Sequence, residues 1–471
     1  MEGSLHDHRR APLSDDRIDR ERRPIRCHIS NEDSSITRTP IDIAPPEERA
    51  LLVGVPLKRP GARRITAEHL RELAELVDTA GAVVIGEITQ QIDRPHPGTY
   101  LGSGKLEELR DRAQQDGATL IVFDDELSPS QGKNIEDAIG IRVMDRAELI
   151  LDIFATRARS AEAKMQVELA QLEYMLPRLT RMWTHLEKFR GGIGMRGPGE
   201  TQLETDRRLI NQRIKILKER LQDVLRGRVV QRQSRQSAFK ASLVGYTNTG
   251  KSSILRALSG ASDVFVENRL FATLDPLTRD VSLDEHAHVL VTDTVGFIRK
   301  LPHHLVASFR ATLEETRDAD LLLHVIDAGS PTWEEQRVVV EQVLDELAVN
   351  DRPKVLVFNK IDLLTHDALL ALQERIGALI PSSIFVSTAT EGGLEPLRRV
   401  LETAVRSRRP MAEIRLSPGD GKLLAEIHRA GHVHAQRMDG DRLVVEARID
   451  DALAGRIRRA GGEVTNGKVT A

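Results

Sequence analysis

Hydrophobic residues change their spacing several times along the chain, and these changes divide it into segments. Residues 1–48 mix charged residues, Ser and Pro without an apolar period, which predicts a disordered tail. Over residues 49–154, continuous apolar runs such as ALLVGVPL and GAVVIGEIT alternate with segments of helical spacing such as TAEHLRELAELVDTAG. This alternation predicts a small α/β domain with a parallel sheet.

Helical spacing dominates residues 155–237. Apolar residues recur there at intervals of three and four in two runs, which are Met165, Leu169, Leu172 and Leu176, and Ile210, Ile214, Leu217 and Leu221. This pattern predicts two long helices, over 155–190 and 200–236, that pack together as an antiparallel arm. The glycine-rich stretch Gly191–Gly199 would then form the tip of the arm.

Two further segments complete the chain. Residues 238–408 again alternate apolar runs with helical spacing, which predicts a second α/β domain. After Pro410, residues 411–471 predict a small α+β domain in the order βαββαβ, with a hairpin turn at Asp439-Gly440-Asp441. We therefore expect a multidomain α/β protein with a two-helix arm between its first two domains.

Composition adds charge to this arrangement. The net charge is only −3, yet residues 157–240 hold 19 Lys and Arg against 9 Asp and Glu, so the arm is basic. Cys27 is the single cysteine, and no disulfide can form within the chain, which fits a reducing cytosol. The N-terminus has no apolar signal segment, and we find no stretch long enough for a membrane span.

A phosphate-binding motif opens the second α/β domain. GYTNTGKS follows an apolar strand and precedes a segment of helical spacing, which is the context that a G-x-x-x-x-G-K-S motif requires. Lys251 is expected to contact the β- and γ-phosphates, and the Ser252 hydroxyl to ligate Mg²⁺. The predicted phosphate-binding residues are Gly245, Tyr246, Thr247, Asn248, Thr249, Gly250, Lys251 and Ser252.

A second motif selects the base. Asn359, Lys360, Ile361 and Asp362 end the apolar strand KVLVFN. A carboxylate at Asp362 can accept two hydrogen bonds from guanine that adenine cannot donate, so the motif favours GTP and weighs against a P-loop ATPase or kinase. The backbone of Ser387, Thr388 and Ala389 is expected to cover the base.

The segments between these motifs carry the predicted chemistry. Asp293, Thr294, Val295 and Gly296 end the run VLVTDTVG, where Asp293 would hold Mg²⁺ through water and Gly296 would donate to the γ-phosphate. Thr273 is placed to close over both, with a solvated loop threonine as the alternative. We assign catalytic roles to Lys251, Thr273 and Gly296, and metal binding to Ser252 and Thr273.

Phe297 follows Gly296, at the position where a Ras-type enzyme has the glutamine that orients the attacking water. Phenylalanine cannot orient water, so we expect slow intrinsic hydrolysis that a partner accelerates.

The motifs together resemble the HflX family of GTPases, from about residue 50 to residue 408. The most specific likeness is GGIGMRGPGETQLETDRR, and GYTNTGKS, LFATLDP and DTVGFIRKLPHHLVASFRATLEE match as well. The resemblance implies guanine-nucleotide residues at the motifs above and at Phe271, Ala272, Thr273, Leu274 and Asp275. It also implies a cytoplasmic Mg²⁺-dependent GTPase that binds the large ribosomal subunit and splits or rescues stalled ribosomes. Thr388 departs from the alanine that the family usually has.

The resemblance further implies that the arm's tip enters the large-subunit RNA near the peptidyl transferase centre. Glycine backbones can approach RNA closely, and arginines pair with or stack on it. The predicted RNA-contacting residues are Arg190, Gly191, Gly192, Gly194, Arg196, Gly197 and Gly199. A plain interhelical connection is the alternative, although such connections usually have about 2–8 residues.

Two hypotheses about the partner follow. The first is a monomeric GTPase that acts on the ribosome, and the second is a GTP-dependent switch for other protein effectors. A basic arm with a glycine tip favours the first, because an effector switch does not need one. The stretch GTYLGSGKLEEL also leaves two options open, ordinary capping of a helix or a second nucleotide or RNA contact, but Leu106 stands where a phosphate loop needs Ser or Thr.

Overall fold

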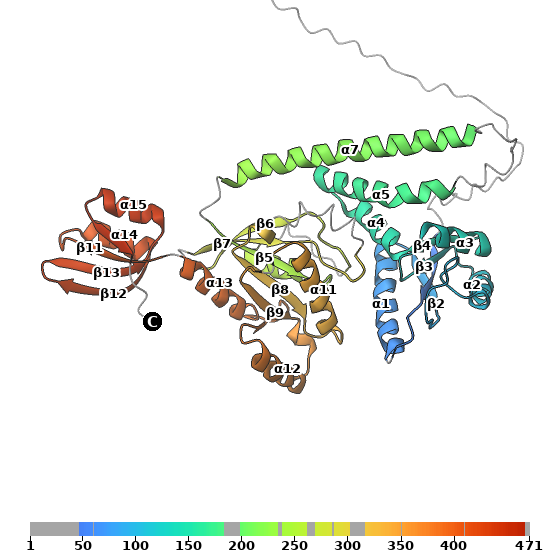
Figure 1. Ribbon diagram of the computed structural model, residues 1–471. Helices are drawn as coiled ribbons and strands as arrows, with labels where there is room; N and C mark the ends of the chain where they lie inside the picture. Colours follow the sequence, from blue (N-terminus) through green and yellow to red (C-terminus); the bar gives the residue numbers. More distant parts are fainter. Residues whose placement is uncertain are drawn as a thin grey trace, which may run out of the picture. The chain divides into compact units, whose positions relative to one another are not determined.

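The computed structural model describes residues 47–59, 61–182, 198–233, 238–260, 269–284, 287–301, 316–349, 351–408 and 410–466 (Figure 1). The tail predicted for residues 1–48 lies almost entirely outside these ranges. So do Arg190, Gly191, Gly192, Gly194, Arg196 and Gly197 of the predicted RNA loop. Within the described ranges, no helix is both long and apolar enough to span a bilayer.

The N-terminal domain is a parallel sheet with helices on both faces, as the alternating pattern predicts. Its strands lie in the order β2-β1-β3-β4. Alternate residues of β1 face opposite sides, so Ala50 and Leu52 pack with α1 and α4, whereas Leu51 and Val53 pack with α2 and α3. The elements are β1 Arg49–Gly54, α1 Ala62–Ala80, β2 Val83–Thr89, α2 Ser103–Asp116, β3 Leu120–Phe123, α3 Pro129–Ile139, β4 Arg142–Asp145 and α4 Arg146–Arg157.

The arm consists of α5 (Ala161–Met182) and α7 (Pro198–Gln233), which run beside each other in Figure 1. Leu169 of α5 packs with Ile214, Leu217 and Leu221 of α7, and the other four residues of the predicted stripes pack against this cluster. The ion pairs Arg213–Glu168 and Lys218–Glu173, at 2.6 and 2.7 Å, flank it. The two apolar faces that the helical period predicts are therefore the faces in contact.

The ends of the arm helices differ from the sequence expectation. A helix from residue 155 is not formed, because α4 ends at Arg157 and the backbone at Ala158 is extended (ψ 115°) before α5 begins. At the other end, α7 begins at Pro198, a residue suited to the first turn of a helix. Gly199 is therefore part of α7 and not of the loop.

The second α/β domain has a six-stranded sheet in the order β10-β9-β8-β5-β7-β6, with only β6 antiparallel to its neighbour among the described pairs. The predicted motifs follow β5, β7 and β9, whose carboxyl ends meet at one edge. The elements are β5 Phe239–Gly245, α8 Lys251–Ser259, β6 Leu277–Ser282, β7 His288–Asp293, β8 Leu321–Asp327, α11 Trp333–Glu346, β9 Lys354–Asn359, η1 Ile361–Leu363, α12 His366–Leu379, β10 Ile384–Phe385 and α13 Glu395–Arg408.

The C-terminal domain has the predicted βαββαβ order, with a four-stranded antiparallel sheet ordered β12-β13-β11-β14. The hairpin between β12 and β13 turns at Gly440, whose φ of 64° suits glycine. The elements are β11 Met411–Leu416, α14 Gly421–Ala430, β12 His432–Asp439, β13 Arg442–Arg448, α15 Asp451–Arg459 and β14 Glu463–Asn466. The multidomain α/β fold class is thus confirmed.

Candidate nucleotide-binding site

The phosphate loop lies between β5 and α8, and glycines allow neighbouring segments to approach it closely. Gly250 has a φ of 91°, and a Cβ there would lie 2.3 Å from Asn359 Nδ2. A Cβ on Gly296 would lie 2.8 Å from the Cα of Thr247. Larger residues are therefore excluded at both positions, and the loop is packed directly against the base motif and the segment after β7.

Lys251 is folded back into this loop. Its Nζ donates to the carbonyl oxygens of Gly245 and Tyr246, at 3.2 and 2.7 Å. Burial lowers the pKa of Lys251 to about 8, and the nearby carboxylate of Asp293 opposes this shift. A phosphate group against the ammonium would favour the charged form further.

Three side-chain oxygens converge beside Lys251. Asp293 Oδ2 accepts from Ser252 Oγ at 2.6 Å and from Thr273 Oγ1 at 2.9 Å, and the two hydroxyls lie 2.8 Å apart. The predicted metal residues are thus brought together although Ser252 and Thr273 are separated by 21 positions. Hydroxyl and carboxylate oxygens are ligands that suit Mg²⁺.

Unpaired buried atoms in the same place fit a bound cation and nucleotide. Asp293 Oδ1, Thr247 Oγ1 and Asn359 Oδ1 are buried without a hydrogen-bond partner among the described residues. Burial raises the pKa of Asp293, against the opposing effects of Lys251 and the two hydroxyls. A divalent cation would reverse that shift, since it favours the charged carboxylate. Ser252 and Thr273 would hold it, and its charge would act on the phosphates.

Two side chains of the base motif donate hydrogen bonds to the phosphate loop. Asn359 Nδ2 donates to the Thr249 carbonyl at 2.9 Å, and Lys360 Nζ donates to the Asn248 carbonyl at 2.7 Å. These bonds tie the motif to the phosphate loop. Asp362 follows these two residues in the short helix η1 and is exposed.

Ser387 has a contact that the sequence did not predict. Its buried hydroxyl donates to Asp362 Oδ1 at 2.5 Å and accepts from Ala389 N at 3.0 Å. Sequence reasoning expected only backbone coverage of the base from Ser387, Thr388 and Ala389. The hydroxyl instead fixes the orientation of the carboxylate that is predicted to select guanine.

The side chains of the segment Phe271–Asp275, which is predicted to contact the nucleotide, point in two directions. Phe271, Ala272 and Thr273 line the pocket. Phe271 otherwise packs edge to face on Phe154 of α4, with ring centroids 4.6 Å apart. Leu274 is buried in the same core, and the Asp275 carboxylate accepts from Ser160 N at 3.1 Å. The Leu274 and Asp275 side chains therefore face α4 and α5 instead of the pocket.

Phe297 is also directed away from the pocket. Its backbone forms a parallel bridge with the phosphate loop, through Phe297 N to Gly245 O at 3.0 Å and Thr247 N to Phe297 O at 2.8 Å. Its ring is 1% exposed and packs in the core shared with α1 and α4. The position that holds a water-orienting glutamine in Ras-type enzymes is thus occupied by a core residue.

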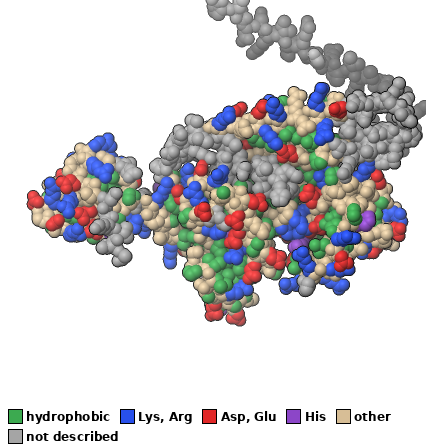
Figure 2. Space-filling model, in the orientation of Figure 1, with side chains coloured by type: hydrophobic (Ala, Val, Ile, Leu, Met, Phe, Trp, Pro, Cys, Tyr) green, Lys and Arg blue, Asp and Glu red, His purple; other side chains and the backbone are tan. Residues whose placement is uncertain are grey.

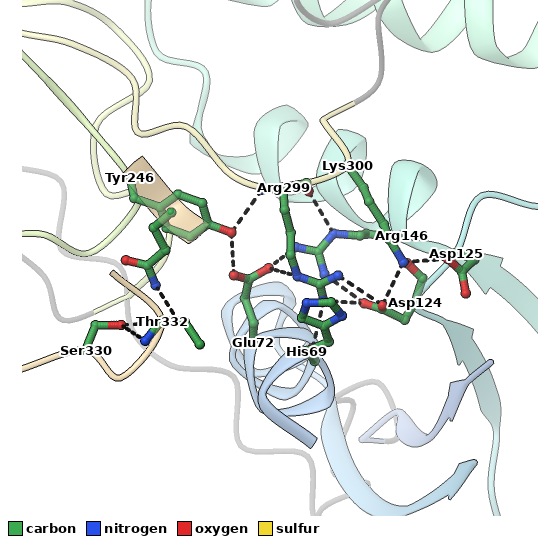
Figure 3. A network of polar contacts seen from close by, with 11 residues as sticks. His69, Glu72, Asp124, Asp125, Arg146, Tyr246, Arg299, Lys300, Ser330 and Thr332 are labelled. Carbon is green, nitrogen blue, oxygen red and sulfur yellow. Dashed lines mark hydrogen bonds and ion pairs between the residues drawn. The ribbon is translucent and has the colours of Figure 1, made fainter. Parts of the chain in front are cut away.

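An ion cluster joins the segment after Phe297 to the N-terminal domain (Figure 3). Arg299 Nη2 and Lys300 Nζ donate to the two oxygens of Asp124, at 2.7 and 2.9 Å. Arg146, which is 1% exposed, donates to Asp124 at 3.0 Å and also pairs with Glu72. Burial alone would raise the pKa of Asp124, but the three cations lower it to about 2.

The same cluster reaches the phosphate loop through Tyr246. The Tyr246 hydroxyl donates to Glu72 Oε2 at 2.6 Å and accepts from Arg299 N at 2.9 Å (Figure 3). Sequence reasoning placed Tyr246 only as a residue of the loop, and it missed Glu72 and Asp124 because neither belongs to a motif. The sequence did carry one signal, since Arg299 and Lys300 follow DTVGFI directly.

Two further residues line the pocket without having been predicted. They are Ser253, which follows the metal residue Ser252, and Arg269, which lies four positions before Thr273. By contrast, the GSGK stretch of the N-terminal domain opens α2 with Gly102 at the N-cap, and Lys105 pairs with Glu108 at 2.6 Å. That arrangement is ordinary for the start of a helix.

The fold and the arrangement of the phosphate loop, the metal oxygens and the base motif define a P-loop GTPase. Three family models match the chain: "GTP-binding GTPase N-terminal" over residues 67–155, "GTP-binding GTPase Middle Region" over 157–235, and "50S ribosome-binding GTPase" over 240–360. Their order follows the N-terminal domain, the arm and the second α/β domain.

Proteins named GTPase HflX match most of the chain. That of Lacrimispora saccharolytica is 45% identical over 88% of this chain and 96% of its own length, and that of Escherichia coli is 43% identical over 79% and 88%. A solved GTP-binding protein of Sulfolobus solfataricus in complex with GDP is 24% identical, covers 76% of this chain and 99% of its own, and has a TM-score of 0.42. The chain belongs to the HflX family of GTPases, and it is an enzyme that binds and hydrolyses GTP.

Proposed function

We propose that this GTPase is a cytoplasmic monomer that binds the large ribosomal subunit and acts in ribosome splitting, rescue or biogenesis. The basic two-helix arm is the observation that carries the proposal. Arg207, Arg208, Lys215 and Arg220 are exposed along α7, and none of them belongs to the apolar contact with α5. Exposed cations on a long helix suit the phosphates of folded RNA, and the name of the family model over residues 240–360 agrees.

The proposed chemistry follows from the site. Ser252 and Thr273 would hold Mg²⁺, Lys251 would bind the β- and γ-phosphates, and Gly296 would donate its N–H to the γ-phosphate. Asp362 binds guanine, and the Ser387 hydroxyl orients the Asp362 carboxylate. Because Phe297 lies in the core and cannot orient water, we expect slow hydrolysis until a partner orders the Asp293–Gly296 segment around the γ-phosphate.

The glycine-rich stretch Gly191–Gly199 is proposed to contact ribosomal RNA at the tip of the arm, with Arg190 and Arg196 beside it. Replacing the stretch by a short Gly-Ser linker should leave basal GTP hydrolysis within about twofold of the wild type, because the stretch contains none of the predicted nucleotide-binding residues. Subunit separation should be lost. Light scattering of ribosomes measures separation, and phosphate release measures hydrolysis. Wild-type splitting by the linker variant would reject the role of the stretch.

A GTP-dependent switch for protein effectors is the second candidate, and one surface favours it. Leu363, Leu370 and Leu379 are 66, 45 and 73% exposed on η1 and α12, next to the base motif. Figure 2 shows hydrophobic side chains gathered over α12. Exposed apolar groups of this kind often mark a protein contact. If large subunits give no acceleration of hydrolysis at any salt concentration, this second function replaces the first.

A further inference from the structure

A carboxylate two residues after Thr273 fastens that segment to the arm. Asp275 Oδ2 accepts from Arg159 N at 3.2 Å and from Ser160 N at 3.1 Å, and Oδ1 accepts from the Ser160 hydroxyl. The Ser160 oxygen in turn accepts from Ala163 N, in the first turn of α5, at 3.0 Å. Asp275 thus completes the N-terminal cap of a helix that lies 115 residues earlier in the chain.

Neighbouring side chains hold the same segment from one side only. Phe271 and Leu274 are 1 and 3% exposed and pack in the core that contains Phe154 and Ala163. Thr273 is turned to the pocket, which Ala272 also lines, and its hydroxyl lies 2.9 Å from Asp293 Oδ2. The segment therefore lies between the metal oxygens, which Thr273 contacts, and the helices α4 and α5, which Phe271 and Asp275 contact.

The distance along the chain makes this arrangement rigid. Two residues cover at most roughly 7 Å. If α5 moved and Asp275 remained bound to it, the Thr273 hydroxyl would therefore be pulled away from Asp293. We infer that Asp275 is a positioning residue for GTP hydrolysis, which holds Thr273 at the metal site by anchoring it to Ser160 at the base of the arm. The inference goes beyond the ribosomal role, because it concerns turnover by the isolated protein.

Steady-state hydrolysis by the full-length protein tests this inference. Asp275→Ala should lower kcat by about tenfold, on the scale expected when a charged hydrogen-bonding group is lost, and should raise the Mg²⁺ concentration needed for half-maximal rate. The KM for GTP and the affinity for GDP should stay within about twofold, since the phosphate loop and base motif are intact. Ser160→Ala, a change in the arm alone, should lower kcat in the same direction by a smaller factor.

Two further variants separate positioning from simple loss of structure. Asp275→Asn keeps an oxygen for the backbone N–H groups and should recover most of the lost kcat. Ser128→Ala is the matched control for Ser160→Ala, because it also removes a capping hydroxyl, that of α3, but contacts no residue of the GTPase domain in the described structure. It should lower thermal stability without changing kcat.

A double-variant cycle decides whether the contact itself carries the effect. The Asp275→Ala/Ser160→Ala double variant should be no slower than Asp275→Ala alone, because both changes break one connection. Wild-type kcat in Asp275→Ala would overturn the inference, as would effects that multiply in the double variant or a GDP affinity that falls with kcat. No ribosome is present in these assays, so failure of the ribosomal proposal would leave their outcome unaffected.

Discussion

The hydroxyl of Ser387 holds one oxygen of Asp362, so the orientation of this carboxylate is set by a residue from another part of the chain. An asparagine at position 362 keeps an oxygen for that hydroxyl, but its NH₂ group donates where the carboxylate could only accept. Xanthine presents a carbonyl where guanine has its amine. A single substitution should therefore change the chosen base without disturbing the rest of the site.

Asp362→Asn is expected to shift preference from GTP to XTP by on the order of a hundredfold or more, since sites that hydrogen-bond a group discriminate strongly. Competition titrations with both nucleotides measure the shift. Glu374→Gln, which neutralises an exposed carboxylate on α12, is the control and should keep the preference for GTP. A GTP preference that survives Asp362→Asn would remove this residue from the base site.

His324 provides a pH-dependent prediction at the same scale. It lies on β8, is 1% exposed, and its Nδ1 has no partner among the described residues. Burial, with nearby Lys354 and Arg337, lowers the pKa of His324 to about 3 from an ordinary value of 6.5. Below pH 6.5 the unfolded chain takes up a proton that the folded chain does not, so stability should fall with falling pH by at most about 1.4 kcal/mol per pH unit.

His324→Leu should flatten this dependence between about pH 6.5 and 4, because the buried imidazole is replaced by an apolar side chain. Urea unfolding at several pH values gives the free energy of unfolding for both proteins. His366→Gln, at the exposed start of α12, should leave the slope as in the wild type. If the free energy of unfolding has the same pH dependence in wild type and His324→Leu, this histidine does not cause the loss of stability at low pH.

Among the elements, the arm depends on one apolar contact between α5 and α7. Leu217 is fully buried in it, whereas Leu209 of the same helix is 55% exposed. Leu217→Ala should lower the local opening free energy of both helices by about 2–5 kcal/mol. Hydrogen exchange resolved to α5 and α7 measures this opening, and Leu209→Ala is the matched control. Equal protection in the two variants would contradict the packing described.

The arm also shows what the sequence could and could not predict. Spacing of three and four identified the eight described apolar residues of the α5–α7 contact, because a helical period directly encodes which side chains share a face. The break at Ala158–Ser160 was not predicted, because part of its cap comes from Asp275, far away in the chain. The phosphate loop and base motif lie beside each other, since both follow strands of one sheet. The role of the Ser387 side chain was missed, because it depends on a tertiary contact.

At the scale of the whole molecule, the N-terminal and GTPase domains are joined by ion pairs between side chains that belong to no sequence motif. Asp124 pairs with Arg146, Arg299 and Lys300, and its neighbour Asp125 pairs with Lys300 at the edge of the cluster. Such a cluster cannot be inferred from sequence, because acidic residues after a strand are common and their partners lie up to 176 positions away. Asp124 and Arg146 are buried, so each of these two ions depends on the charge of the other.

Asp124→Ala should destabilise the folded protein by about 3–5 kcal/mol, because it leaves Arg146 buried with one fewer counter-charge. Asp125→Ala removes the same charge at a more exposed position and should cost less than about 1 kcal/mol. Chemical unfolding of both variants measures the difference. Similar stabilities for the two would show that the cluster contributes little to the contact between the domains.

Co-sedimentation with purified large ribosomal subunits tests the central claim most directly. The protein bound to a non-hydrolysable GTP analogue should pellet with large subunits, bind them more tightly than the GDP-bound protein does, and lose affinity steeply as salt rises. Arg207→Glu/Arg208→Glu on α7 should weaken pelleting while the affinity for GTP stays unchanged. A protein that remains in the supernatant at low salt with either nucleotide would contradict the account.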